Sequence, residues 1–184
     1  MRGPRFTALL ALAPLLSSSL SGCDLTGTLL KAQVDGTNEF AAAKGQEMAD
    51  PEMVGPVMAA GVVTNEGFLY YVPEYEPLIQ STVFGNIAYG VGWLGSAAKQ
   101  AEQEGKYEQV EHLNKRARLL FARALNLTKR MLRLRDEGFD QALAGGIDVF
   151  KVWVDENFFT KEDAPIMLTA GMAYFVSMLN SEEG

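Results

Sequence analysis

Residues 106–136, KYEQVEHLNKRARLLFARALNLTKRMLRLRD, carry the clearest periodicity in the chain. Apolar residues recur there in steps of three and four, at Val110, Leu113, Ala117, Leu120, Ala124, Leu127, Met131 and Leu134. Such spacing places one apolar stripe along an α-helix and leaves the other faces to charged residues. The segment therefore predicts a long amphipathic helix that ends at Gly138.

The preceding segment, residues 74–103, has a matching apolar stripe. Its members are Phe84, Ile87, Val91, Leu94, Ala98 and Ala101. Gly105 allows a tight turn between the segments, so we expect an antiparallel hairpin of two helices with facing stripes. Gly85, Gly92 and Gly95 each cost up to about 1 kcal/mol in helix propensity, and we expect close packing or a cavity to compensate.

Further helices are predicted before the hairpin. Residues 50–52, DPE, combine a capping residue, a proline at the first helical position and an acid in the first turn, which is typical of a helix start. This helix is expected to extend to about Tyr71, because Pro73 follows two residues later and would interrupt a helix. Thr37 or Asn38 is expected to cap a shorter helix through Met48.

After the hairpin, short helices are expected over residues 139–144 and 148–155, around a glycine pair. Residues 160–163, TKED, resemble a capping box with Asp163 at the third helical position. This box would open a final helix over residues 164–179. The predicted fold class is therefore all-α.

The amino terminus is typical of an export signal. Arg2 and Arg5 precede an apolar stretch, residues 6–16, that is too short to span a membrane. Residues 20–23, LSGC, then resemble a bacterial lipobox, in which Cys23 is acylated and becomes the new amino terminus. An ordinary secretory signal with an incidental cysteine is the alternative. Several acyl chains would give lasting membrane attachment.

This interpretation predicts three parts and a location. We expect a signal peptide at 1–22, a lipid anchor and tether at 23–36, and a helical domain at 37–184. The protein would lie in the bacterial cell envelope, lipid-anchored on the periplasmic side. The choice between inner and outer membrane stays open.

Two uncharged stretches, residues 78–98 and 164–181, are long enough to cross a bilayer. The first contains polar residues and four glycines, and it continues into a charged segment. A buried helix in a soluble helical domain explains both stretches better than a membrane span.

Charge and composition exclude several classes of function. The net charge is −7, and loss of residues 1–22 with Arg2 and Arg5 would make it −9, which disfavours nucleic acid as a partner. One cysteine and one histidine cannot form an internal disulfide or a zinc site of the usual kind. We find no phosphate loop, nucleophile elbow or dinucleotide fingerprint, and we expect no cofactor, metal or catalytic residue.

The charged side chains support ordinary roles first. Nine of the 16 basic residues fall between Lys106 and Arg135, where they form the outer helix face; an anionic partner is the alternative. His112 is expected on the surface. An enzyme would need the acids at 155–156 and 162–163 gathered around a cleft with shifted pKa values, but helix capping and solvation explain them.

Aromatic residues are the candidates for ligand binding. Phe84, Tyr89 and Trp93 share the glycine-rich helix, and Trp153, Phe158 and Phe159 precede the last helix. An ordinary core is the favoured explanation. Glycines beside large aromatic rings are also one way to build a cavity for an apolar small molecule, and this alternative stays open.

Three motifs occur in a recognisable order. Residues 116–124, RARLLFARA, follow an acidic helix end and Gly105; residues 138–143, GFDQAL, come next; and residues 161–165, KEDAP, open an apolar helix of small residues. Their order and spacing, over roughly residues 40–180, resemble the T component associated with TRAP transporters. The signal with its lipobox fits this family too.

The resemblance implies a periplasmic lipoprotein with a solenoid of tetratricopeptide-like helical hairpins. Members are linked to a substrate-binding P component and to TRAP membrane subunits, and they are proposed to aid uptake of hydrophobic or organic-acid ligands. It also implies homotrimers with a pore or cleft in each subunit. A generic helical-repeat scaffold for envelope protein assembly is the alternative function, and it would bind only proteins.

Two departures from the family pattern affect these expectations. Leu168-Thr169 and Tyr174-Phe175 stand where the family tends to carry aromatic residues and a tryptophan, so Tyr174 joins the candidate ligand-facing wall. The sequence stops at residues 181–184, just after an uncharged helix, whereas a solenoid end normally has a polar cap. We therefore expect a truncated or diverged chain, or a partner that covers the last helix.

Overall fold

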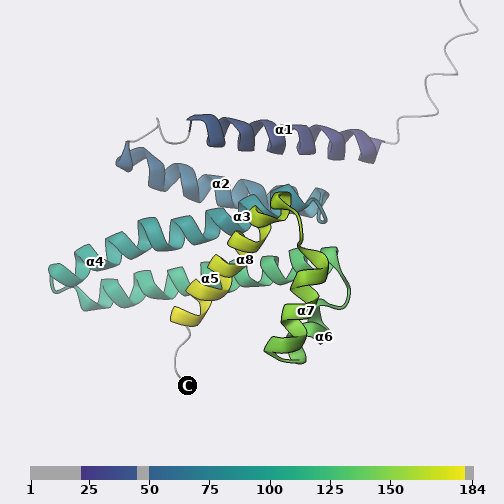
Figure 1. Ribbon diagram of the computed structural model, residues 1–184. Helices are drawn as coiled ribbons and strands as arrows, with labels where there is room; N and C mark the ends of the chain where they lie inside the picture. The colour runs from purple at the N-terminus through teal and green to yellow at the C-terminus, as the bar shows by residue number, and fades with distance from the viewer. Residues whose placement is uncertain (1–21, 45–49, 181–184) are drawn as a thin grey trace, which may run out of the picture.

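The computed structural model describes residues 22–44 and 50–180, and this part of the chain contains helices and turns without a strand (Figure 1). The all-α class is therefore confirmed. A tetratricopeptide-like repeat stays a prediction. The expected export signal covers residues 1–22, and all of it except Gly22 lies outside the described residues, as do residues 181–184.

A long antiparallel hairpin forms the centre of the fold. Its first arm is one continuous rod made of α3 (Glu76–Ala88), the π-helix η1 (Tyr89–Leu94) and α4 (Gly95–Gln103), and its second arm is α5 (Tyr107–Arg135). Gly105 turns the chain with a φ of +72°, a conformation that favours glycine. Its N–H donates to Glu102 O, and the next N–H, of Lys106, donates to Ala101 O at 2.9 Å. These two bonds form a Schellman motif, and the predicted hairpin is confirmed.

The predicted stripe on α5 is mostly confirmed. Leu113, Ala117, Ala124, Leu127 and Met131 are buried, as are three residues that the steps of three and four leave out, Phe121, Thr128 and Leu132. Leu134 is 42% exposed, so its assignment to the seam is wrong. An α-helix with 3.6 residues per turn drifts away from a spacing of 3.5, and the buried face therefore moves to neighbouring positions toward the end of α5.

The stripe on the first arm needs a larger correction. Ile87, Leu94, Ala98 and Ala101 are buried as predicted. Phe84 and Val91 are 54% and 52% exposed, so both assignments are wrong. The buried face runs instead through Ile79, Val83 and Gly90, and the π-helical turns of η1 change the register between the two halves of the arm.

Close packing is confirmed at Gly85, one of the three predicted glycines, and is tighter still at two glycines that were not predicted, Gly55 and Gly90. A Cβ on Gly90 would lie 2.5 Å from Phe121 Cε1, and one on Gly55 would lie 2.2 Å from Trp93 Cε2. A Cβ on Gly85 would lie 3.2 Å from Val62 Cγ2, whereas a Cβ on Gly92 would meet nothing within 4 Å. Aromatic rings therefore fill the space that Gly55 and Gly90 leave.

Two further helices cover the hairpin, α1 (Gly22–Lys44) and α2 (Pro51–Tyr71) (Figure 1). The start of α2 is confirmed, because the N–H groups of Met53 and Val54 both donate to Asp50 O. The prediction of a non-helical stretch before a cap at Thr37 or Asn38 is wrong. Thr37 lies inside α1 and its hydroxyl donates to Gln33 O at 2.8 Å.

The last third of the chain packs across one end of the hairpin. It contains α6 (Phe139–Ala144), α7 (Ile147–Asn157), the short 3₁₀ helix η2 (Lys161–Asp163) and α8 (Ala164–Leu179). α8 crosses α3 and α5 (Figure 1). The capping box is confirmed, since Asp163 Oδ2 accepts bonds from the N–H of Thr160 at 3.1 Å and from its hydroxyl at 2.9 Å. Within the described ranges, no helix has the length and apolar character that crossing a bilayer requires.

Candidate ligand pocket

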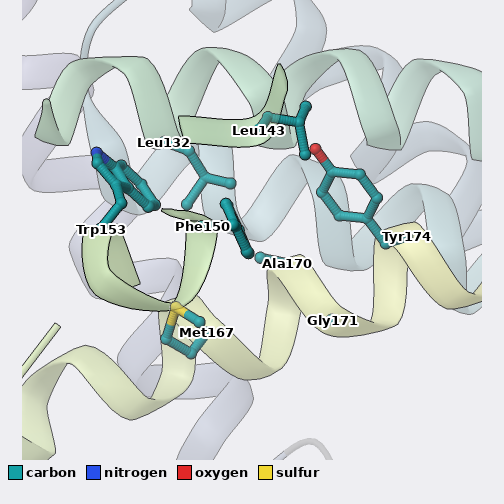
Figure 2. Close-up of a pocket in the computed structure, with 8 residues that line it drawn as sticks. All are labelled: Leu132, Leu143, Phe150, Trp153, Met167, Ala170, Gly171 and Tyr174. Carbon is teal, nitrogen blue, oxygen red and sulfur yellow. The ribbon is translucent and has the colours of Figure 1, made fainter. Parts of the chain in front are cut away.

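A pocket of about 270 Å³ lies between the end of α5 and helices α6, α7 and α8 (Figure 2). Its walls combine one face of α8 with a small cluster of buried core residues, namely Leu132, Phe139, Ala142, Trp153 and Ala170. Eight residues line it: Leu132, Leu143, Phe150, Trp153, Met167, Ala170, Gly171 and Tyr174. None of these eight carries a charge, so the pocket is suited to apolar molecules.

The aromatic wall of the pocket is held in place by Asp136. The ring of Phe150 stacks on that of Trp153, with centroids 5.7 Å apart, and Phe139 meets the same indole edge-on at 5.3 Å. The Trp153 Nε1–H donates to Asp136 Oδ1 at 2.8 Å, and the N–H of Gly138 donates to the same oxygen at 2.8 Å. The carboxylate that ends α5 therefore fixes the indole beside the pocket.

Tyr174 supplies the other polar group of the lining. Its hydroxyl is buried and has no hydrogen-bond partner among the described residues. Figure 2 shows this hydroxyl directed toward Leu143. Burial raises the pKa of Tyr174, while nearby Arg133 lowers it and Asp140 raises it. The hydroxyl is thus kept in its neutral form, which can donate and accept hydrogen bonds.

An ion pair lies near this hydroxyl. Arg133 donates to Asp140 through Nε and Nη2, at 2.7 and 2.8 Å. The pKa of Asp140 is lowered, above all by this hydrogen bond. Both side chains are about half exposed. The guanidinium is therefore already engaged by a carboxylate, and the pair presents little net charge to Tyr174.

The pocket opens at Gly171 and Leu143. Leu143 is 40% exposed, and Gly171 is exposed on α8. A Cβ added to Gly171 would meet nothing within 4 Å. A side chain added at Gly171 would therefore begin in open space beside the pocket lining.

The structure brings together two of the five aromatic residues predicted to bind a ligand, which are Phe84, Tyr89, Trp93, Trp153 and Tyr174. Trp153 and Tyr174 line the pocket. Tyr89 and Trp93 are half-buried against the central core, and Phe84 borders a separate depression of about 290 Å³ that includes Gln80 and Thr169. A ligand-binding role for any of the five stays a prediction, and so does the acylation of Cys23, which lies at the start of α1.

Most of the pocket could not be singled out from the sequence. Leu132 and Phe150 are apolar residues of amphipathic helices, Met167 belongs to a helix that is apolar throughout, and nothing distinguishes the three from core residues. The spacing of Phe150 and Trp153 by three residues on one helix was the one available signal, because such residues share a face.

The paired acids have structural positions. Asp163 closes the capping box, and its pKa is lowered first by the side-chain hydrogen bond from Thr160. Arg135 Nη1 also lies 3.4 Å from Asp163 Oδ1. Asp155 and Glu156 are exposed on α7. Over residues 22–44 and 50–180, no group of three or more His, Cys, Asp or Glu side chains is placed to hold a metal ion.

Comparison with known proteins gives one match. A family model described as TRAP transporter T-component matches residues 47–183, which include the central hairpin and the whole pocket. No curated protein and no solved structure matches the chain.

Proposed function

The chain belongs to the TRAP transporter T-component family, and from this premise we propose that it is a lipid-anchored periplasmic accessory that binds a TRAP-type substrate-binding protein and a small apolar ligand. Family membership makes it a component of a TRAP transport system in the cell envelope. The partner, the ligand, the anchor at Cys23 and assembly into homotrimers are the proposed parts.

One observation carries the proposal: Gly171, an exposed residue of the pocket lining, lies within an exposed apolar stripe of α8. Leu168, Phe175 and Leu179 are 66%, 58% and 67% exposed. Their spacing of seven and four residues places them on the same side of the helix. Side chains of this size and exposure in one stripe are typical of a surface that contacts another protein.

The position of Gly171 connects the two activities. It lies between Leu168 and Phe175 in the exposed stripe, and it also lines the pocket. A protein bound to this face would therefore cover the mouth, and a ligand could pass between pocket and partner without crossing bulk water. Such a path is what a transport accessory for an apolar compound requires, because water disfavours its release.

The test is capture of the partner from membrane extracts of the source organism. We expect the purified protein to recover a TRAP-type substrate-binding protein. Phe175→Asp should abolish the capture, while Leu119→Asp, at a 66% exposed position on α5, should leave it intact. Recovery of envelope-assembly factors alone would support the alternative scaffold function and contradict the proposal.

Assembly into homotrimers has a separate readout. Light scattering of the purified protein is expected to give the mass of a trimer. Phe175→Asp should leave this mass unchanged, because the α8 face is proposed to bind the substrate-binding protein. A monomeric wild-type protein that still captures the substrate-binding protein would remove the trimer from the proposal and leave the accessory function in place.

A further inference from the structure

Two polar side-chain groups belong to the pocket lining, and they differ in their bonding. The Trp153 indole N–H is satisfied by Asp136 at 2.8 Å. The Tyr174 hydroxyl is buried and has no partner within residues 22–44 and 50–180. A buried hydroxyl that makes no hydrogen bond costs free energy, so native structures usually satisfy it. A ligand that enters the pocket with a hydroxyl or carbonyl group would satisfy it.

Building on the proposed function, we infer that the pocket takes an uncharged, mainly apolar ligand whose one polar group bonds to the Tyr174 hydroxyl. The hydroxyl can donate to a carbonyl or exchange a hydrogen bond with an alcohol. The remaining walls are hydrocarbon, aromatic rings and the Met167 side chain. They offer contact area to an apolar body and give no further polar recognition.

The walls also select against charge. A carboxylate in this pocket would lose its hydration, and none of the eight lining residues supplies a cation to replace it. The guanidinium of Arg133, which lowers the pKa of Tyr174, donates hydrogen bonds to both carboxylate oxygens of Asp140. An anionic ligand would have to break this pair, whereas a neutral ligand leaves it intact.

The volume limits the size of the ligand. A dry apolar cavity of roughly 150 Å³ accommodates benzene. The pocket has about 270 Å³. Two fused six-membered rings with one small substituent are therefore a suitable probe, and the flat wall of Phe150 and Trp153 favours an aromatic body.

The test compares three probes of one shape by titration calorimetry of the purified protein at neutral pH. The probes are 2-naphthol, which is neutral and polar at one point, naphthalene, which has no polar group, and the anion 2-naphthoate. We expect 2-naphthol to bind about two- to tenfold more tightly than naphthalene, as one hydrogen bond provides. The anion should bind at least about tenfold more weakly than 2-naphthol, because its charge is buried without a partner.

Two variants assign these differences to the pocket. Tyr174→Phe should equalise 2-naphthol and naphthalene while leaving naphthalene binding within about twofold, since one hydrogen bond is all that it removes. Gly171→Leu should abolish binding of all probes by filling the mouth. Gly67→Leu is the matched control, because Gly67 is exposed on α2 and nothing lies within 4 Å of its added Cβ.

The outcomes separate this inference from the proposed function. Equal binding of 2-naphthol and naphthalene would overturn the inferred role of the Tyr174 hydroxyl and leave an apolar-ligand pocket in place, whereas tightest binding of 2-naphthoate would overturn both. Binding of none would overturn the inference together with the ligand half of the proposed function. Capture of the substrate-binding protein does not depend on any of these results, so it tests the partner half alone.

Discussion

The Asp136 carboxylate accepts a hydrogen bond from the Trp153 indole at 2.8 Å and so joins the end of α5 to α7. The same oxygen accepts the N–H of Gly138, which begins the turn into α6. The ring of Trp153 is 6% exposed and packs against Phe139 and Phe150. One carboxylate thereby fixes both the turn and the aromatic wall of the pocket.

Replacement of Asp136 should destabilise this end of the molecule. We expect Asp136→Ala to lower the free energy of unfolding by about 1–3 kcal/mol, because the buried indole N–H loses its acceptor. Urea unfolding followed by tryptophan fluorescence measures this. Asp155→Ala, at an exposed acid on α7, is the control and should change it by less than about 0.5 kcal/mol. Equal effects of the two variants would contradict a bonded role for Asp136.

The glycines of η1 should differ sharply in their tolerance of a methyl group. Gly90→Ala would bring a Cβ to 2.5 Å from Phe121 Cε1, and overpacking of this kind costs about 1–3 kcal/mol. Gly92→Ala meets nothing within 4 Å, so it should instead stabilise the helix by up to about 1 kcal/mol. Thermal unfolding of both variants gives the comparison. Similar melting temperatures would show that Phe121 does not pack against Gly90.

Removal of the Tyr174 hydroxyl should not weaken the ligand-free protein. Tyr174→Phe deletes a buried hydroxyl that has no partner in the described part of the chain, so its unfolding free energy should be unchanged or up to about 1 kcal/mol higher. Urea unfolding without ligand is the measurement. A clear loss of stability would mean that the hydroxyl makes a structural bond, and the pocket would then have no free polar group to offer.

The fold was largely predictable because local signals and the hydrophobic period agree. Gly105 and the paired stripes define the central hairpin, and residues 160–163 define the start of α8. The period alone placed Phe84, Val91 and Leu134 in the seam, where the structure leaves them exposed. The spacing of apolar residues does not reveal a π-helical segment, which changes the register of the buried face. It also ignores that a helix with 3.6 residues per turn gradually departs from a spacing of 3.5.

The pocket was predictable only in part, for a different reason. Trp153 stood out as a large aromatic residue and Tyr174 through its place in the family pattern, and both line it. The pairing of glycines with aromatic rings favoured an ordinary core and left a cavity in the hairpin as the alternative; the structure shows the core, because Phe121 and Trp93 fill the gaps at Gly90 and Gly55. Whether a glycine leaves a void depends on which side chain crosses from another helix, and that is a long-range property of the packing.

The proposed anchor at Cys23 can be tested directly. Cys23→Ala should remove the acyl chains and with them the lipid-dependent attachment to the membrane, because the thiol that would carry them is missing. Incorporation of labelled palmitate into the wild-type protein, and its loss in the variant, confirms the chemistry. Label that persists in Cys23→Ala would count against a lipid anchor at this position.

Alkaline titration should reveal the bond that holds α1. The Tyr75 hydroxyl donates to Asp35 Oδ1 of α1, and burial followed by this hydrogen bond raises the pKa of Tyr75 from 10.0 to about 12. Since the pKa is higher in the folded protein, the stabilisation is complete below pH 10.0 and is lost as the pH rises through about 12. Because the pKa of Tyr174 is raised too, the titration uses the Tyr174→Phe protein, in which ultraviolet absorbance should show Tyr75 ionising at this higher pH. Tyr75→Phe should remove that step, and Asp35→Asn should shift it toward 10.0. A late step that persists in Tyr75→Phe would assign it to another tyrosine and leave the contact between Tyr75 and α1 unsupported.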